Sequence, residues 1–354
     1  MNQPSIVSVG TALPPHYVTQ AEITSALADL WAGKDDKLAL LRRLHRSTEV
    51  QGRYMSLPLQ KYVELKSFGE ANSHYTRAAL DLAEKACARA IAEAGLSPAD
   101  IDSITTVTVT GISTPSLDAR LVNRIGLPAR VKRTPIFGLG CVAGAAGIAR
   151  VSDYLRGFPS HTALLVSVEL CTLTVQPHDQ SVENIIATGL FGDGAAAVVL
   201  RGADHLPHRL RPRVIASESV FYPDTERVMG WDVKDSGFKV VLSGSVPTLV
   251  QEKIRGDVDR FLQNQGLSRA DIRHWVLHTG GPKVLSAFAT ALELPDGALD
   301  RSWQSLRSLG NLSSSSVLFV LSEFLADPSA QPGDLGMLLA MGPGFCSELV
   351  LLRW

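Results

Sequence analysis

Three residue types in this sequence could together carry chemistry: a cysteine, a histidine and an asparagine, each close to glycine. Cys141 follows a glycine turn and opens a helix of small residues that we expect to reach about residue 156. The free N–H groups at a helix start carry roughly half a positive charge, which lowers the cost of forming a thiolate, the nucleophilic form of cysteine. His278 stands where a strand meets a glycine turn, and Asn311 follows Gly310 at the start of another helix.

This combination is suited to acyl transfer through a cysteine thioester. The thiolate needs a basic or cationic neighbour, and a carbonyl intermediate needs donors for its developing oxyanion, which an imidazole and an amide can supply. Plainer roles remain open at this stage, because Cys141 can be a small apolar filler and Asn311 a helix N-cap. No cysteine or acidic partner completes a metal site around His274 and His278, so we expect no metal.

A second function class competes for the same glycines. Residues 138–143 match the loose dinucleotide fingerprint GxGxx(G/A), and the strand that follows ends in Glu169, a pattern typical of nicotinamide-dependent dehydrogenases. The strand before these glycines is short, however, and its neighbourhood is basic. The dehydrogenase interpretation also leaves an internal repeat of the chain unexplained.

The repeat relates the two halves of the chain. Residues 95–101, Gly-Leu-Ser-Pro-Ala-Asp-Ile, return as residues 266–272, Gly-Leu-Ser-Arg-Ala-Asp-Ile. At nearly the same spacing, Leu-Gly-Cys141 corresponds to Leu-Gly-Asn311, and residues 151–155 correspond to residues 321–325. We therefore expect Cys141 and Asn311 to open equivalent helices that face each other across a pseudo-twofold axis.

Alternating strands and helices predict an α/β fold in layers. Strands are expected near residues 6–10, 104–110, 162–168, 195–200 and 335–341, and a long amphipathic helix over residues 73–94. Thr19 and Glu22 form the pattern of a capping box before another helix. We expect an N-terminal half over residues 1–206 and a C-terminal half over residues 207–354, joined by the polar stretch 207–213.

Composition excludes several function classes. The 354 residues are 45% hydrophobic and 19% charged, with a net charge of −1, so no nucleic-acid or anionic membrane partner is indicated. Four scattered cysteines without a CxxC pair favour free thiols in a reducing compartment. With no signal peptide and no run long enough to cross a bilayer, we expect a cytoplasmic protein without stable membrane insertion.

Five motifs in order resemble the type III polyketide synthases, the chalcone-synthase-like enzymes of the thiolase fold. They are GCVAG around Cys141, LFGDGAAA at residues 190–197, HTGGP from His278, GNLSS around Asn311 and MGPGF at residues 341–345. The resemblance implies two duplicated halves in an αβαβα arrangement, a homodimer, and acyl-CoA and malonyl-CoA as substrates without a cofactor. Ketoacyl-ACP synthases and a non-catalytic partner subunit of the same fold remain alternatives.

The resemblance also implies roles for individual residues. Cys141 would carry the acyl and growing polyketide chain, while His278 and Asn311 would promote malonyl decarboxylation and hold the enolate and oxyanion. Phe191 and Phe238 match the two gatekeeper aromatics. Two basic residues fall near the contacts to the phosphates of CoA, although a one-residue length difference affects their alignment: Arg42 and Arg46.

Departures from the plant pattern bear on the starter unit. Cys171 stands where plant enzymes usually have threonine, and strand alternation would place it on the same face as Glu169, with Leu173 and Thr114 close by. These small or flexible side chains would open a narrow apolar tunnel. Each buried CH₂ contributes about 0.8 kcal/mol, which favours fatty acyl chains. The sequence therefore predicts a medium- or long-chain acyl-CoA starter and an alkylpyrone or alkylresorcinol product.

Overall fold

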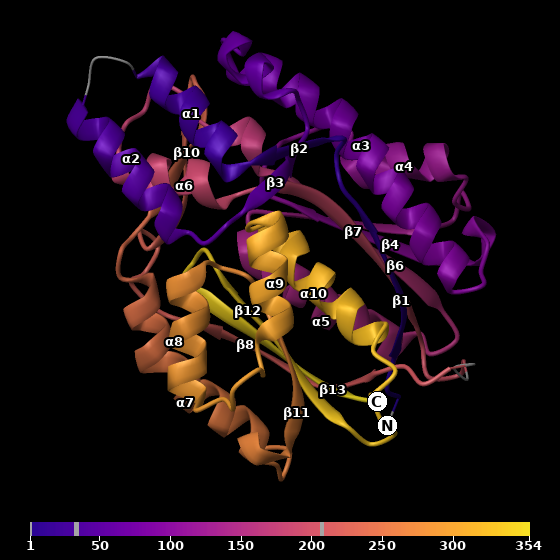
Figure 1. The fold of residues 1–354 in the computed structure, drawn as a ribbon. Helices are drawn as coiled ribbons and strands as arrows, with labels where there is room; N and C mark the ends of the chain where they lie inside the picture. Colours follow the sequence, from indigo (N-terminus) through magenta and orange to yellow (C-terminus); the bar gives the residue numbers. More distant parts are fainter. Residues whose placement is uncertain (1, 32–34, 206–208) are drawn as a thin grey trace.

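One nine-stranded sheet runs through the whole chain in the order β11-β12-β13-β8-β1-β7-β6-β4-β5 (Figure 1). This computed structural model describes residues 2–31, 35–205 and 209–354. The first half of the chain contributes β1 (Ser5–Ala12), β4 (Ser103–Thr108), β5 (Lys132–Phe137), β6 (Thr162–Leu170) and β7 (Asp193–Arg201). The second half contributes β8 (Arg213–Phe221), β11 (Ile272–Leu277), β12 (Leu335–Gly342) and β13 (Cys346–Arg353).

The strand pairing repeats from one half to the other. In the first half, β4 and β6 are parallel, whereas β6–β7 and β7–β1 are antiparallel. In the second half, β11 and β12 are parallel, whereas β12–β13 and β13–β8 are antiparallel. The halves meet where β1 pairs β8 at Ser5 and Arg213. The expected boundary between residues 206 and 207 lies outside the described residues.

Helices cover both faces of the two half-sheets and also fill the space between them. The central layer consists of α5 (Ala143–Gly157) and α10 (Ser316–Leu325). The outer layers are α3 (Phe68–Glu93) with α4 (Leu117–Ile125), and α7 (Val246–Gln263) with α8 (Pro282–Leu292) (Figure 1).

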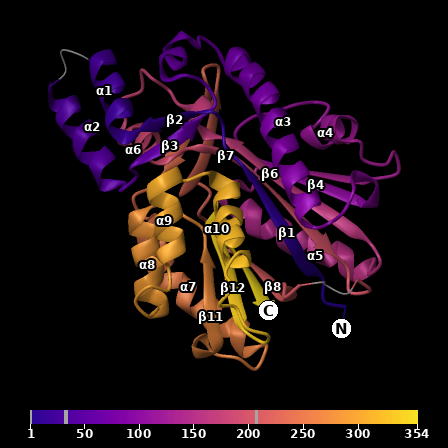
Figure 2. The same cartoon turned by 45° about the vertical axis from the view of Figure 1, so that its right-hand side comes forward.

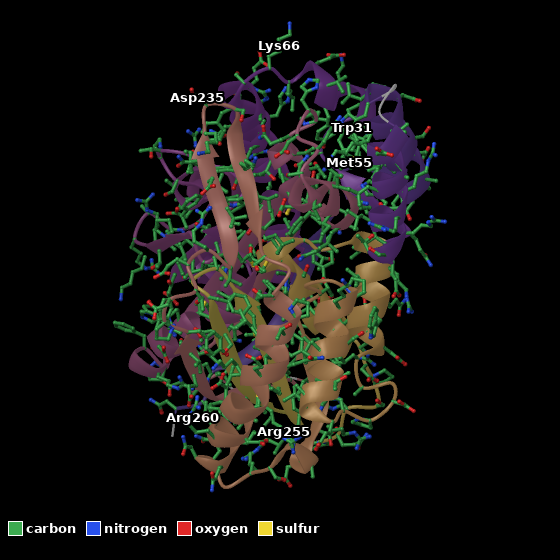
Figure 3. All side chains as sticks on the ribbon, turned by 90° about the vertical axis from the view of Figure 1, so that its left-hand side faces the viewer. Trp31, Met55, Lys66, Asp235, Arg255 and Arg260 are labelled. Carbon is green, nitrogen blue, oxygen red and sulfur yellow. The ribbon has the colours of Figure 1, made fainter. Side chains whose placement is uncertain are left out.

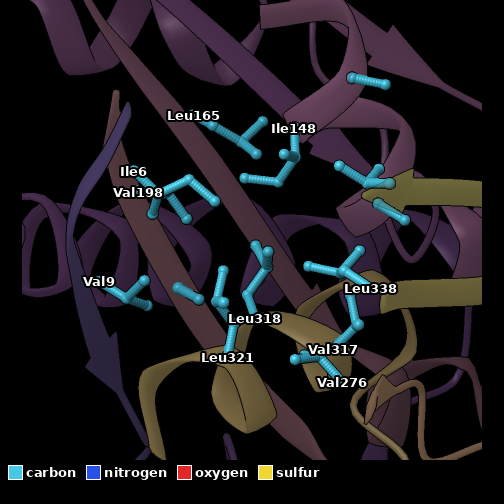
Figure 4. Packing of buried hydrophobic residues seen from close by; sticks show 14 of the residues in the cluster. Ile6, Val9, Ile148, Leu165, Val198, Val276, Val317, Leu318, Leu321 and Leu338 are labelled. Atoms are coloured by element: carbon cyan, nitrogen blue, oxygen red, sulfur yellow. The ribbon is translucent and has the colours of Figure 1, made fainter. Parts of the chain in front are cut away.

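Alternation along the strands explains this layering. On β7, Ala196, Val198 and Leu200 join the central core with α5 and α10, whereas the intervening residues pack with α3. On β12, Leu338 faces the same central core (Figure 4), and Leu339 faces the core that includes α7 and α8. The five-layered αβαβα arrangement expected for the thiolase fold is confirmed.

Smaller elements gather at one end of the layered body (Figure 2). They are β2 (His16–Thr19), α1 (Gln20–Leu30), α2 (Asp35–Ser47), β3 (Gly52–Met55), α6 (Val182–Leu190), β9 (Met229–Lys234) and β10 (Gly237–Leu242). Figure 3 places Lys66 and Asp235 at this end and Arg255 and Arg260 of α7 at the opposite end. A last helix, α9 (Asp300–Leu309), leads into Gly310 and Asn311.

Local signals in the sequence predict several of these elements well. The capping box of Thr19 and Glu22 is present at the start of α1. The long helix expected from residue 73 begins earlier, at Phe68, because the Ser67 side chain accepts a hydrogen bond from the Glu70 N–H and caps it there. Element type therefore follows from local pattern, whereas the precise ends depend on caps.

The two central helices approach each other closely near Cys141. A Cβ atom at Gly144 would lie 2.2 Å from the Ser314 carbonyl oxygen and 2.7 Å from Val317 Cγ1. Glycine at this position thus allows the turn that carries Cys141 to meet the segment that follows Asn311.

We therefore expect Gly144→Ala to lower the free energy of unfolding by about 1–3 kcal/mol, the usual cost of overpacking. Denaturant unfolding followed by circular dichroism measures this loss. Gly157→Ala is the matched control, because nothing lies within 4 Å of a Cβ atom at the far end of the same helix. Equal stability of the two variants would contradict the importance of this contact.

Candidate active site

A cavity of about 230 Å³ brings Cys141, His278 and Asn311 together. Cys141 comes from the turn η3 (Gly140–Val142) before α5, His278 from the end of β11, and Asn311 from the segment between α9 and α10. Apolar side chains form much of the remaining wall, among them Leu190, Phe191, Met229, Val250, Phe288 and Met341. Cys141 directly precedes α5, but Asn311 does not open α10, because it pairs with Phe191 in a β-bridge and α10 begins at Ser316. The two residues related by the repeat nevertheless share one cavity.

The Cys141 thiol is buried, with 7% of the residue exposed. Its Sγ atom lies 3.7 Å from the Ser313 hydroxyl oxygen. Burial raises the pKa of the thiol to about 12, although hydrogen bonding to Ser313 opposes this shift. The pKa of the thiol is therefore raised and not lowered as expected from the helix start, because desolvation of the buried thiolate is the largest effect.

The His278 imidazole is also buried, and neither ring nitrogen has a hydrogen-bond partner within the described residues. Its backbone N–H donates to the Leu339 carbonyl across the sheet at 3.0 Å, which fixes the residue at the end of β11. Burial lowers the pKa of the ring to about 3, so the imidazole is neutral at physiological pH. A buried, unpaired imidazole at a cavity wall is available to a ligand.

Asn311 is held by both its backbone and its side chain. Its N–H donates to the Leu190 carbonyl at 2.9 Å, and its own carbonyl accepts from the Gly192 N–H at 3.0 Å. The side-chain Oδ1 accepts from the Ser313 N–H at 2.8 Å. The capping role considered from the sequence is wrong, because the residues at the N-cap positions of the two following helical segments are Leu312 and Ser315. The amide NH₂ remains as the donor of Asn311 on the side of Cys141, whose thiol it approaches.

The two expected gatekeeper aromatics lie in different surroundings. Phe191 lines the cavity of Cys141 and also a smaller apolar cavity of about 60 Å³. Phe238 does not line the Cys141 cavity. It is buried against Phe68, with ring centroids 5.0 Å apart, and stacks on Trp231 at 6.0 Å.

The residues expected to form an acyl tunnel do not line the Cys141 cavity. The strand β6 ends at Leu170, and Cys171 begins the turn η4 (Cys171–Thr174), so strand alternation does not extend to it. Leu173 lines a separate cavity of about 450 Å³ with Lys66 and Lys239. Thr114 is exposed. Cys171 is buried and close enough to Cys141 and Glu169 for their charges to raise the pKa of its thiol, whereas Leu173 and Thr114 lie in different surroundings.

Positive charge lies at the cavity wall and near it. Lys283, at the start of α8, lines the cavity and was missed from the sequence, although it directly follows the HTGGP motif. Leu44, Ser47 and Thr48 bring the end of α2 to the same wall. The exposed cations of that helix include Arg42 and Arg46, the two residues expected near the phosphates of CoA.

The glycines of the dinucleotide-like pattern serve packing here. A Cβ atom at Gly140 would lie 2.7 Å from the Pro343 ring, so the second glycine accommodates a neighbouring chain segment and leaves no room for a pyrophosphate. The nicotinamide alternative is thereby contradicted. Within the described residues, no group of three or more His, Cys, Asp or Glu side chains could hold a metal ion.

The described helices include none that is both long enough and apolar enough to cross a bilayer.

Comparison with known proteins places this site in a family. Family models for the N-terminal and C-terminal domains of chalcone and stilbene synthases match residues 2–205 and 213–354. A 1,3,6,8-tetrahydroxynaphthalene synthase from Streptomyces peucetius subsp. caesius is 51% identical over 99% of this chain and 93% of its own. A phloroglucinol synthase from Pseudomonas fluorescens is 34% identical over 96% of each chain.

Solved structures agree with this relationship. The tetrahydroxynaphthalene synthase of Streptomyces coelicolor, described as a bacterial type III polyketide synthase, superposes with a TM-score of 0.92 at 31% identity over 99% of both chains. PKS-I from the brown alga Ectocarpus siliculosus gives a TM-score of 0.93 at 27% identity, covering 100% of this chain and 98% of its own. The chain therefore belongs to the chalcone and stilbene synthase family and is a type III polyketide synthase.

Proposed function

We propose that Cys141, His278 and Asn311 carry out decarboxylative Claisen condensation of a CoA-linked starter with malonyl-CoA. The observation that carries this proposal is their convergence at one buried cavity, where the imidazole and the amide NH₂ are available to a ligand. Lys283 at the cavity wall and the exposed Arg42 and Arg46 near it provide positive charge for the phosphates of CoA.

The loading step begins with a proton transfer inside the cavity. Burial raises the pKa of Cys141 and lowers that of His278, so a single charge on either group is costly. Transfer of the thiol proton to the imidazole keeps the pair neutral overall. The thiolate then attacks the thioester carbonyl, the acyl group bonds to Sγ, and CoA leaves as a thiolate that takes a proton from the imidazolium.

Chain extension forms an enolate anion, which His278 and Asn311 stabilise. Malonyl-CoA loses CO₂, and the electron pair of the broken C–C bond becomes the enolate of acetyl-CoA. The His278 ring and the Asn311 amide stabilise the enolate oxygen by hydrogen bonds. The enolate carbon attacks the Cys141 thioester, the bond from the acyl carbon to Sγ breaks, and Cys141 leaves as a thiolate while the lengthened chain stays on CoA. The thiolate then attacks the new CoA thioester, CoA leaves, and the chain is back on the cysteine for another round.

Replacing Cys141 by alanine should abolish covalent loading of the starter and leave the fold intact. Incubation with acyl-CoA labelled in the acyl group, followed by mass spectrometry of the intact protein, measures the attachment. Cys346→Ala is the control, because this half-buried thiol lies outside the cavity and its loss should leave loading unchanged. Label on the alanine variant at position 141 would assign the acyl group to another residue.

His278→Ala and Asn311→Ala should each slow malonyl-CoA decarboxylation by about 10²-fold or more, the effect of losing an oxyanion donor. Release of ¹⁴CO₂ from carboxyl-labelled malonyl-CoA gives the rate. His274→Gln is a matched control, since His274 lies at the other end of β11 and pairs with Asp334 at 3.0 Å. Unchanged decarboxylation in both cavity variants would remove these side chains from the reaction.

We also propose that two copies pair along the free edge of the sheet. β5 pairs only with β4 among the described strands, and its residues from Lys132 to Pro135 are exposed. Phe137 and Ile112 are large apolar residues of the same region with 52% and 45% exposure. Phe137→Glu should therefore shift the protein from dimer to monomer in analytical ultracentrifugation, whereas Phe221→Glu, at the exposed end of β8, should not.

The starter unit can be a fatty acyl-CoA or malonyl-CoA itself, and these two possibilities make different demands on the cavity. A fatty acyl starter would leave an alkyl tail on the product and needs an apolar tunnel from the Cys141 cavity, which Cys171, Leu173 and Thr114 do not line. Tetrahydroxynaphthalene, the product named for the relative at 51% identity, has ten ring carbons and no tail. Five two-carbon units account for them, so malonyl-CoA alone is a sufficient source of carbon.

We therefore expect malonyl-CoA by itself to yield a polyhydroxylated naphthalene. The test supplies the enzyme with malonyl-CoA alone and with a panel of saturated acyl-CoA starters from two to sixteen carbons, and identifies products by liquid chromatography and mass spectrometry. Efficient turnover only in the presence of a long-chain starter, with alkylpyrones or alkylresorcinols as products, would restore the expectation drawn from the sequence.

A further inference from the structure

Arg53, at the second position of β3, is a buried cation whose guanidinium binds mainly backbone carbonyls. Only 1% of the residue is exposed, and within the described part of the chain no carboxylate lies close enough for a salt bridge, although the charge of the buried Asp193 carboxylate favours the guanidinium cation. Its guanidinium instead donates to backbone carbonyls, from Nη1 to Thr188 at 2.7 Å and Phe191 at 3.1 Å, and from Nη2 to Gly189 at 2.8 Å. The Gln20 side-chain oxygen accepts a further bond from Nη2.

These carbonyls belong to the end of α6, where a helix leaves its last C=O groups without partners of its own. The negative end of the helix dipole also favours a cation at this position. The planar fork of arginine can bind several acceptors at once, which a lysine ammonium on its flexible stem does less well. Burial lowers the pKa of Arg53 to about 9, and the group still carries its charge at neutral pH.

The remaining carbonyl of this short segment binds Asn311. Leu190 lies between the residues that Arg53 holds, and its carbonyl accepts from the Asn311 N–H. The Gly192 N–H completes the bridge by donating to the Asn311 carbonyl. No space separates the two segments, because a Cβ atom at Gly192 would lie 2.5 Å from the Leu309 carbonyl oxygen. A shift of the segment from residue 188 to residue 191 must therefore shift Asn311.

The segment around β3 also holds the chain on the other side of Gly192. The N–H of Ser56, directly after β3, donates to the Asp193 carboxylate at 2.8 Å, and the same carboxylate accepts from the Thr172 N–H at 2.8 Å. The loop between α6 and β7, which presents Phe191 to the cavity, is thus held by Arg53 before the turn and by Ser56 after it.

We propose that Arg53 is a positioning residue for decarboxylation, which holds the end of α6 so that Asn311 and Phe191 keep their places at the cavity. Arg53 does not line the Cys141 cavity and acts only through the backbone of residues 188–192. This inference rests on the proposed role of Asn311 in stabilising the enolate.

The test compares two partial reactions of Arg53→Met. Acyl loading depends mainly on Cys141 and His278, which belong to other segments, and should fall much less than decarboxylation. Decarboxylation should fall by about 10²-fold, the scale for misplacing a catalytic group by about 1 Å. The loss should appear in kcat for decarboxylation, with the KM for malonyl-CoA little changed.

Arg211→Met is the matched control for stability. Arg211 is also largely buried and binds backbone carbonyls, from Nε to Val7 at 2.7 Å and from Nη1 to Leu325 at 3.4 Å, but it lies outside the cavity wall. Its variant should lose thermal stability and keep the ratio of the two partial reactions. Equal loss of loading and decarboxylation in Arg53→Met would overturn the proposal, since a merely structural role lowers both.

The conservative variant Arg53→Lys and the combination of Arg53 variants with Asn311→Ala distinguish a positioning role from a loss of folding. Arg53→Lys retains the charge and should fold even where the methionine variant does not, with decarboxylation reduced by about tenfold because one ammonium cannot replace the fork. In an Asn311→Ala background, either Arg53 variant should cause no additional loss. If an Arg53 variant lowered the decarboxylation rate by the same factor with and without Asn311→Ala, the positioning role of Arg53 would be overturned. Normal decarboxylation by Asn311→Ala itself would instead refute the proposed function of Asn311.

Discussion

The close contact between the two central helices is the constraint on which the site depends. Gly144 of α5 lies against the backbone of Ser314, and this approach places the turn of Cys141 next to the segment of Asn311. Each helix is covered by half of the sheet and, beyond the sheet, by an outer layer of helices. The layered core thus places the segments before α5 and before α10 at one cavity, although they are far apart in the chain.

Burial determines the electrostatics of that cavity. Desolvation raises the pKa of Cys141 and of the nearby Glu169, and it lowers the pKa of His278. Glu169 is fully buried, and its partners among the described residues are neutral donors such as the Thr110 hydroxyl at 2.7 Å and the Val109 N–H at 3.0 Å. Isolated charges are costly in such surroundings, so chemistry there favours proton transfers that conserve net charge.

The loop between α6 and β7 connects the two halves of the site in a different way. It presents Phe191 to the cavity, and its backbone pairs with Asn311 from the second half of the chain. A buried guanidinium supplies the bonds that the helix end lacks. Arg53 can satisfy several carbonyls at once because its donors are arranged in a plane, and these bonds, together with the charge of the buried Asp193 carboxylate, explain how the cation persists in the interior.

The sequence by itself determined the layered fold class, the duplication and the candidate nucleophile. The repeated Leu-Gly pair places Cys141 and Asn311 at corresponding positions of the two halves, and the alternation of strands with helices indicates the layers. Motifs and hydrophobic periodicity depend on residues that are close in the sequence, so they can be recognised without knowledge of the tertiary contacts. The same local reasoning failed beyond residue 170, where alternation was extended to Cys171 although the strand ends at Leu170.

Only the tertiary structure decided which side chains share the cavity and what charge they carry. The pKa of Cys141 depends on how much protein surrounds it, and no helix-start pattern reports this. Lys283 and Arg53 acquire their surroundings from segments remote in the chain, so their sequence neighbours gave little sign of a role. Burial and long-range hydrogen bonding are properties of the packed molecule, because each requires residues that the sequence places far apart.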